Sequence, residues 1–521
     1  MSAWPNSYQQ WREKRREWIQ ELRDGDITVL SGLYMIVSEP RNPLLPEVMA
    51  AIAETMEAMD INQQLAWDNR FRDSTSMEWS VDWCLVEPEA AKPFLRCERD
   101  YLWLLRLGTL HPNGYYREKC LMELSSFPGE LDYILLRTND WVGAVRELAM
   151  ELAKKAVPES DCTQILRAIP FLEKAKRGGR RDTGAFAQVE AQVAERIVGL
   201  LRLSDGEGFR TVTSCDLRIR QGIYRMLLQG KHLTIEEVDR LLSMEKSNEC
   251  CTRLIRYLLY RYPYDEERVE KYLQNKNGIV RKYAVECKYE YLKDAWDGLE
   301  EMLLDSCRGV REYAAYILQR CREMDVGAFY RECLRELEKA DCPEAVIIGL
   351  GEYGESGDSG LIIPYLRDLK ERIVKAALFS LSKLVGQEGA ELYWPFLLHE
   401  KPGIVREAYR AAVKSEVHYG AERLFHAIEE AVYPRSRFYL TNLLCRESGW
   451  ESLPWLLRFY RFGRDDIVRL ESLQAAFARR ALHTKISAAL EREIREVLAD
   501  EENEIPQSLA EQILFDLKYV T

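Results

Sequence analysis

The chain repeats a short pattern of apolar and basic positions at an almost constant interval. In each copy an apolar residue precedes an arginine or lysine, and an alanine or another apolar residue usually follows three positions after the basic residue. We call this pattern the signature. Its clearest copies are Val145-Arg146, Val280-Arg281, Val310-Arg311, Val374-Lys375, Val405-Arg406 and Val468-Arg469, and weaker copies in the same phase begin at Tyr116, Ile219, Cys250, Cys342 and Ser436. From residue 219 onward the copies begin 30 to 32 residues apart, an interval typical of helical repeat proteins.

Each interval predicts two amphipathic helices joined by a turn. After Val310, apolar residues continue at Ala314 and Leu318, which would share one face of an α-helix. Gly354 and Gly386 stand twelve residues after the start of their copies and can end the first helix in the left-handed conformation. A hairpin of about 30 residues cannot bury its apolar face alone, so neighbouring hairpins must stack. The pattern therefore predicts an all-α solenoid.

The segment LGEYGESGDSGLIIPYL, from Leu350 to Leu366, resembles the turn between the short bacterial HEAT repeats of the PBS-lyase type. This resemblance covers roughly residues 106–521 and implies a right-handed α-solenoid of about a dozen hairpins. Residues 1–105 carry no signature, and we expect them to form a helical N-terminal cap region. The repeat loses its phase at about 155–212, where we expect an irregular insertion. HEAT repeats serve many unrelated tasks, so the resemblance implies a fold and not a function.

An acidic or amide residue often stands six positions before the signature arginine. In HEAT proteins this pairing resembles a structural ladder between neighbouring hairpins, and we expect the same role here. The pairs are Asp140 and Arg146, Asn275 and Arg281, Asp305 and Arg311, and Glu400 and Arg406.

Composition narrows the classes of protein that the chain can belong to. Hydrophobic residues make up 47% of the chain and charged residues 30%, which is enough apolar material for a large core. The net charge of −12 disfavours non-specific binding to nucleic acid or to an anionic membrane. The thirteen cysteines are odd in number and show no CxxC spacing, which favours free thiols in a reducing compartment. Neither a signal peptide nor a membrane-spanning segment is expected, so we predict a cytoplasmic protein without membrane association.

Few stretches of the sequence resemble a catalytic motif. Gly349, Gly351 and Gly354 match the dinucleotide fingerprint GxGxxG, but they lie in phase with the repeat, and no βαβ pattern surrounds them. We interpret these glycines as a helix end and turn. The six histidines are scattered without zinc-ligand spacing. We therefore expect no cofactor, no metal and no catalysis, although a site assembled in space from distant residues stays an open alternative.

The predicted function is a scaffold that holds a protein or peptide on the concave face of the solenoid, where the signature helices lie. Tyrosine is common at binding hot spots, and the candidate partner-binding residues are Tyr289, Tyr316, Tyr409 and Tyr439. Tyr283 and Tyr313 share one repeat position, where packing between hairpins explains them equally well. Because the chain is acidic, we expect the partner to present a basic segment.

The alternative function is nucleic-acid binding. The most basic stretch of the chain lies at residues 173–184, and its glycines suggest a flexible loop with phosphate-binding donors. The candidate residues are Lys174, Lys176, Arg177, Arg180 and Arg181. HEAT-like DNA glycosylases of the AlkD type combine tryptophan, aspartate and arginine in a basic groove, and Asp140, Trp141 and Arg146 supply those residue types. This alternative therefore covers a DNA repair glycosylase or a DNA- or RNA-binding accessory factor.

Overall fold

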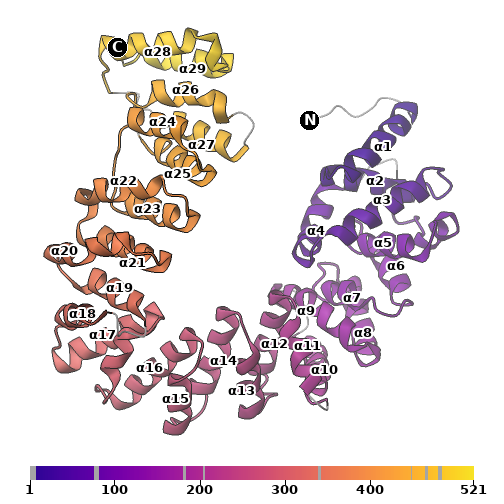
Figure 1. Ribbon diagram of the computed structural model, residues 1–521. Helices are drawn as coiled ribbons and strands as arrows, with labels where there is room; N and C mark the ends of the chain where they lie inside the picture. The colour runs from indigo at the N-terminus through magenta and orange to yellow at the C-terminus, as the bar shows by residue number, and fades with distance from the viewer. Residues whose placement is uncertain are drawn as a thin grey trace. The chain divides into compact units, whose positions relative to one another are not determined.

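The computed structural model describes residues 8–75, 81–179, 183–203, 206–337, 342–447, 449–463, 467–478 and 484–520. All regular secondary structure within these ranges is helical, as the signature pattern predicts. The contacts divide the chain into two compact units, residues 1–264 and residues 265–521. The predicted boundary at residue 105 is a different division, and it stays a prediction. Figure 1 shows the helices following one another in chain order within each unit.

The first unit contains α-helices and short 3-10 helices, which are labelled η. They are α1 (Tyr8–Arg23), η1 (Ile27–Val29), α2 (Leu30–Tyr34), η2 (Met35–Ser38), α3 (Leu45–Ala58), α4 (Ile61–Ser74), η3 (Pro88–Phe94), α5 (Glu98–Gly108), α6 (Gly114–Leu124), α7 (Leu131–Arg137), α8 (Gly143–Glu159), α9 (Cys162–Arg177), α10 (Thr183–Leu201), α11 (Glu207–Ser214), α12 (Leu217–Gln229), α13 (Ile235–Met244) and α14 (Asn248–Tyr260).

The second unit continues the same alternation of helices and turns. Its elements are α15 (Glu266–Leu273), α16 (Gly278–Leu292), η5 (Leu299–Leu304), α17 (Arg308–Arg322), α18 (Val326–Arg335), α19 (Pro343–Tyr353), η7 (Ser356–Asp358), α20 (Ser359–Ile362), η8 (Ile363–Arg367), α21 (Glu371–Leu384), η9 (Gly386–Gly389), α22 (Ala390–Leu397), α23 (Pro402–Lys414), α24 (Ala421–Glu430), α25 (Pro434–Leu444), α26 (Leu453–Gly463), α27 (Ile467–Phe477), α28 (Ala488–Ala499), η10 (Glu501–Asn503) and α29 (Gln507–Leu517).

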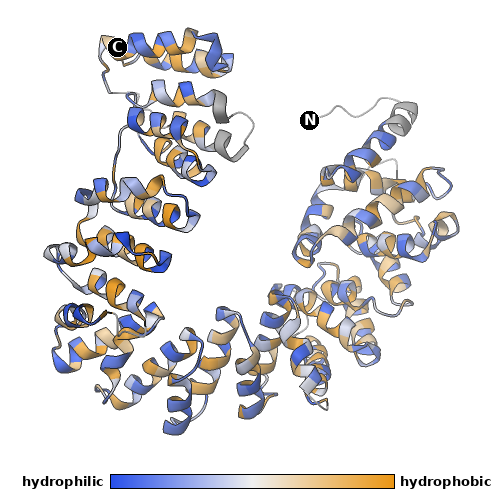
Figure 2. Ribbon diagram, in the orientation of Figure 1, coloured by the Kyte–Doolittle hydropathy of each residue, from blue (hydrophilic) through white to orange (hydrophobic). Residues whose placement is uncertain are grey.

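Every signature copy lies at the start of a helix. The copies fall at the N-terminal ends of α6, α8, α12, α14, α16, α17, α19, α21, α23, α25 and α27, which we call the signature helices. Several of them contact the next signature helix: α6 contacts α8 and α12 contacts α14 in the first unit, and α19, α21, α23 and α25 contact in succession in the second. Apolar and polar residues alternate around most helices in both units (Figure 2), because each helix buries one face and exposes the other.

The N-terminal segment shares a core with the first signature helix. One cluster of buried apolar side chains extends from α1 through α5 to α6, α7 and α9. Within it, the Tyr34 hydroxyl donates a hydrogen bond to the Leu104 carbonyl at 2.7 Å and lies 3.1 Å from the Tyr116 hydroxyl. Residues 8–75 and 81–105 are therefore packed against the repeats that follow them and contribute helix faces to the same unit.

The glycine-rich segment of α19 reflects close helix packing. A Cβ atom on Gly349 would lie 2.1 Å from the Tyr330 ring, and one on Gly351 would lie 2.5 Å from the Ser380 Cα. The expected left-handed helix end is present at Gly386, whose φ is +54°. It is wrong for Gly354, which ends α19 in an extended conformation with φ −85° and ψ −179°.

Two further observations concern the chain's environment. Within the described ranges, no helix is both long and apolar enough to cross a membrane. All thirteen cysteines are free thiols, and most of them are buried or half-buried.

Candidate functional site

The turn before a signature helix is built by one repeated hydrogen bond. A side chain near the end of the preceding helix accepts a hydrogen bond from the backbone N–H two residues further on. Five examples join Asp140 to Val142, Glu245 to Ser247, Asn275 to Asn277, Asp305 to Cys307 and Asp368 to Lys370, at 2.6 to 2.9 Å. In two further turns the acceptor is the histidine Nδ1 of His111 or His399, at 3.1 and 3.0 Å. Short polar side chains favour such turns because they replace a backbone acceptor.

In the predicted ladder pairs, all of which lie within the described residues, the arginine makes no hydrogen bond or ion pair with the side chain of the residue six positions before it. Arg281 donates to the Asp305 carboxylate of the following copy at 2.6 and 2.7 Å, and to the backbone carbonyl of Asn275 at 2.6 Å. Arg311 in turn donates to the backbone carbonyl of Asp305 at 2.9 Å. The signature arginine therefore binds the carbonyl of its own turn, and the side chain of the acid binds the arginine of the preceding copy.

The same arrangement surrounds Asp140. Arg117, from the preceding copy, donates to its carboxylate at 2.7 and 3.1 Å, and Arg146 donates to its backbone carbonyl at 2.7 Å. Arg220 and Glu245 form a further pair at 3.2 Å. These two residues occupy the ladder positions of their copies, so their phase in the repeat was the signal that could have identified them.

No hydrogen bond or ion pair joins Glu400 to Arg406 among the described residues, and both side chains are exposed. The preceding copy carries Lys375 in place of an arginine, and Lys375 pairs with Glu371 at 3.2 Å. Because lysine lacks the planar fork of arginine, it cannot make the two-pronged contact that the other acids receive.

The four candidate tyrosines form two pairs in the second unit. The ring centroids of Tyr289 on α16 and Tyr316 on α17 lie 6.1 Å apart, and Tyr313 lies within 6.2 Å of both rings. Tyr409 on α23 and Tyr439 on α25 form the second pair, at 4.8 Å. Each pair bridges two neighbouring signature helices, as expected from their shared helix row.

The first pair lies on a surface with acidic neighbours. We call Tyr289, Tyr313 and Tyr316 the tyrosine cluster. Tyr316 is 45% exposed and accepts a hydrogen bond from Arg320 at 2.9 Å. Burial and the negative charges of Glu286 and Glu290 raise the pKa of Tyr313. The cluster thus presents aromatic rings beside carboxylates.

A second and more enclosed site lies in the first unit. A pocket of about 540 Å³ opens between α4, the end of α7 with the turn after it, the end of α9 and the start of α12. We call it the basic pocket because of its charged lining residues, which are Asp68, Arg72, Arg137, Asp140, Lys174, Arg177 and Arg218. Asn62, Asn139 and Trp141 also line it.

The local sequence explains how these helices are placed. Asp60 caps α4 and exchanges hydrogen bonds with Gln63, and Asp161 does the same for α9 with Gln164. Such reciprocal caps satisfy N–H groups that a helix start leaves without partners. Asp216 caps α12 by accepting from the backbone N–H of Arg218.

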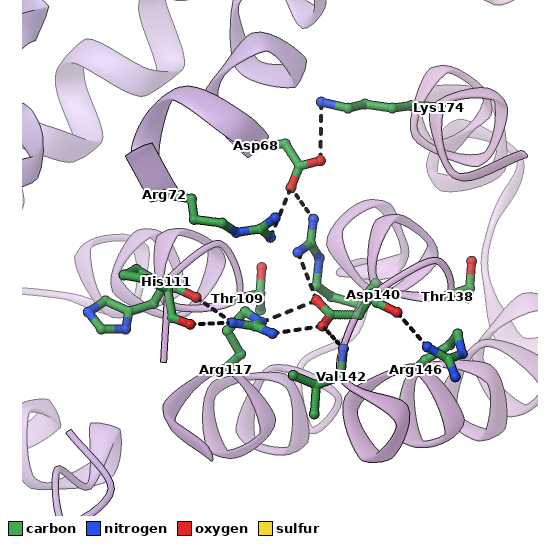
Figure 3. Close-up of polar contacts among 12 residues, drawn as sticks. Asp68, Arg72, Thr109, His111, Arg117, Thr138, Asp140, Val142, Arg146 and Lys174 are labelled. Carbon is green, nitrogen blue, oxygen red and sulfur yellow. Dashed lines mark hydrogen bonds and ion pairs between the residues drawn. The ribbon is translucent and has the colours of Figure 1, made fainter. Parts of the chain in front are cut away.

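Two buried carboxylates organise the cations of the pocket (Figure 3). Asp68 pairs with Arg137, with Lys174 at 3.2 Å and with Arg72 at 3.9 Å. Asp140 pairs with Arg117 and also with Arg137, at 3.0 Å. Burial alone would raise the pKa of each carboxyl group, but the surrounding cations lower both values, and the positive charge of Arg137 is the largest single cause of each lowering. Both aspartates are therefore held ionised.

Two of the pocket's cations, Arg72 and Lys174, have lowered pKa values, which disfavours their charged forms. Burial lowers the pKa of Arg72, and the positive charge of Arg137 lowers it further. Burial also lowers the pKa of Lys174, despite its contact with Asp68. Trp141 forms part of the wall: it is 44% exposed, and the Cζ atoms of Arg72 and Arg117 lie 3.9 and 4.9 Å from its ring centroid.

The structure corrects the expected basic loop. Lys174, Lys176 and Arg177 form the last turn of helix α9, where positive side chains interact favourably with the helix dipole. Lys174 and Arg177 line the basic pocket, whereas Lys176 pairs with Glu190. Arg180 and Arg181 lie outside the described residues.

The structure brings together part of the tryptophan, aspartate and arginine set. Asp140 and Trp141 line the pocket, but Arg146 is turned to the Asp140 carbonyl. Sequence reasoning missed Asp68, Arg72, Arg137 and Arg218. The spacing of Asp68 and Arg72 places them on one face of α4, but nothing in the sequence shows that this face meets α7 and α9.

Comparisons with known proteins do not assign a family. No family model matches the chain, and no curated protein matches it. Within the described part of the chain, no group of three or more His, Cys, Asp and Glu side chains is placed to hold a metal ion.

Proposed function

We propose that the chain is a non-catalytic, HEAT-like binding protein of the cytoplasm that holds a protein or peptide partner. Its fold would be a right-handed solenoid of about a dozen hairpins, with the signature helices lining the concave face. The successive contacts of α19, α21, α23 and α25 support this arrangement, and the thirteen free thiols support a reducing compartment.

The observation that carries this proposal is the tyrosine cluster. Aromatic side chains dominate binding energy at interfaces because they bury a large apolar area with few rotatable bonds. The cluster joins α16 to α17, and Glu286 and Glu290 lie close enough to Tyr313 to raise its pKa. A partner segment with apolar and basic side chains would complement this surface, since the rings offer apolar contact and the carboxylates offer charge.

The test is affinity purification of the full chain from native extract, with and without nuclease treatment, followed by mass spectrometry. A Tyr289→Ser/Tyr316→Ser double variant is compared with the wild type and with Tyr115→Ser, a control at another exposed tyrosine in the first unit. We expect one stoichiometric protein to be retained by the wild type and the control and lost from the double variant.

Equal recovery by the double variant would contradict the tyrosine cluster as the binding surface. Recovery that disappears with nuclease would contradict a protein partner. The partner's own sequence gives a further check, because the segment that crosslinks to the cluster should be basic.

Nucleic-acid binding is the second candidate function. It is favoured by one observation: Lys174 and Arg177 line the same pocket as Asp140 and Trp141. In that case a labelled oligonucleotide should bind with an affinity that falls steeply as salt increases, and the tyrosine variants should bind it as the wild type does.

A further inference from the structure

The basic pocket contains more positive than negative charge. Its lining includes five cationic side chains and two carboxylates. Arg117, which lies behind Asp140, adds a sixth cation that pairs with this carboxylate. The chain as a whole has the opposite sign, with a net charge of −12. An excess of cations in a partly buried pocket is unfavourable unless an anion joins them.

Some of the donors in the pocket have no acceptor within the protein. Arg72 donates no hydrogen bond to any described residue: its ion pair with Asp68 is long, at 3.9 Å, and its Nε is buried without a partner. The Nε of Arg137 is also buried without a partner. Arg177 is exposed and makes no hydrogen bond or ion pair with described residues. A guanidinium carries five N–H donors, so Arg72 and Arg177 keep terminal donors that no described residue accepts from.

We infer that the basic pocket binds the phosphate group of a small phosphate monoester. The two aspartates balance two of the six cations, Arg117 included, which leaves a surplus that suits a doubly charged anion. A phosphate monoester approaches a charge of −2 near neutral pH and offers three acceptor oxygens. A carboxylate offers one charge and two oxygens, and it would leave more of the surplus unmatched. Arginine is the residue best suited to two-pronged contacts with phosphate.

The size of the pocket indicates a small molecule. A volume of about 540 Å³ lies within the range of small-molecule sites. It can hold the organic part of the ester as well as its phosphate, and the exposed side of Trp141 offers that part an apolar wall. Arg72 is held against the Trp141 ring, so its guanidinium is positioned before the ligand arrives.

The same observations disfavour a polynucleotide as the ligand. A nucleic-acid strand requires a row of cations that follows several phosphates, whereas here the cations converge on one pocket. The internal phosphates of a nucleic-acid strand are also diesters, each with a single charge. This inference goes beyond the proposed partner-binding function, because it concerns another unit of the chain and another class of ligand.

Calorimetric titration of the full chain tests the inference with three probes: inorganic phosphate, adenosine monophosphate, and a single-stranded oligonucleotide without terminal phosphates. We expect saturable binding of the first two and none of the third. In an Arg177→Gln variant the affinity for phosphate should fall about tenfold, which corresponds to about 1.4 kcal/mol. This arginine is exposed and has no partner among the described residues, so its loss should leave the fold intact.

Lys176→Gln is the matched control, because it removes the same charge from the same helical turn outside the pocket. It should bind phosphate as the wild type does. The inference is overturned if neither phosphate compound binds saturably, or if both variants lose affinity equally. It is also overturned if the oligonucleotide alone binds, which would support nucleic acid as the ligand. None of these results changes the test of the tyrosine cluster.

Discussion

The turns before α8 and α17 follow one structural rule but have different surroundings. At the turn before α17, Asp305 receives one arginine, Arg281, at 2.6 and 2.7 Å. At the turn before α8, Asp140 receives two, Arg117 and Arg137. Arg137 also contacts a second carboxylate, that of Asp68 on α4.

The difference comes from what packs beside each turn. Helix α4, from the N-terminal segment, brings Asp68 and Arg72 to the α8 turn, and the end of α9 brings Lys174. At the α17 turn, the Asp305 carboxylate pairs, among the described residues, with Arg281 of the neighbouring repeat. A ladder position is therefore a structural contact in one place and part of a candidate binding pocket in another, although the local sequence pattern is the same.

The largest expected effect is a difference in the stability lost when each of the two aspartates is replaced. Asp140→Asn leaves Arg117 and Arg137 buried with reduced compensation, so we expect a loss of about 3 to 5 kcal/mol. Asp305→Asn faces a single arginine that lies nearer to solvent, and we expect about 1 kcal/mol. Hydrogen exchange of peptides from α8 and α17 measures each local stability. Equal losses would show that the second arginine and Asp68 add nothing to the Asp140 turn.

The turn before α6 extends the comparison, because His111 there replaces the carboxylate. Burial and the positive charge of Arg117 lower the pKa of His111 to about 3. The folded state therefore requires the neutral ring, whereas the unfolded chain takes up a proton near the ordinary value of about 6.5. The stability that the neutral His111 ring contributes is fully present above a pH of about 6.5. It is lost as the pH falls from there toward about 3.

We expect the first unit to lose about 2 kcal/mol between pH 7 and pH 5 through His111. Denaturant unfolding monitored by exchange in α6 measures this slope. His111→Asn keeps a hydrogen-bond acceptor at the turn without the titration, so its slope should be smaller. An unchanged slope in this variant would assign the acid sensitivity to another group.

A third prediction uses phosphate to distinguish the two turns. At a concentration ten times its dissociation constant, phosphate should slow exchange in α4 and α9 about tenfold. Exchange in α16 and α17 should not change, because Asp305 and Arg281 already satisfy each other. A uniform slowing in both units would indicate a general salt effect and would contradict a localised site.

The smallest effect is expected at Glu400. Its side chain is exposed, and among the described residues it makes no hydrogen bond or ion pair with Arg406, so Glu400→Ala should change stability by less than about 0.5 kcal/mol. Thermal unfolding of the Glu400→Ala variant, measured together with that of Asp305→Asn, provides the comparison. A loss as large as that of Asp305→Asn would show that Glu400 has a partner after all.

The sequence predicted the helices better than the candidate sites. Each copy of the signature marks the start of a helix because its apolar positions recur with helical period. The tyrosine pairs could also be anticipated, because their members occupy the same row of neighbouring helices. The basic stretch was misjudged as a loop, since Gly178 suggested a break that begins only after the helix has placed Lys174 and Arg177.

By itself, the sequence determined the all-helical structure, the positions of the signature helices and the residues available for each turn. These features depend on contacts within one hairpin or between adjacent hairpins, and a periodic pattern records such contacts directly. Only the tertiary structure decided that Asp68 meets Arg137 across 69 positions of sequence. Such a contact requires α4 to pack beside α7 and α9, and this packing depends on the shape of whole helix faces rather than on local spacing.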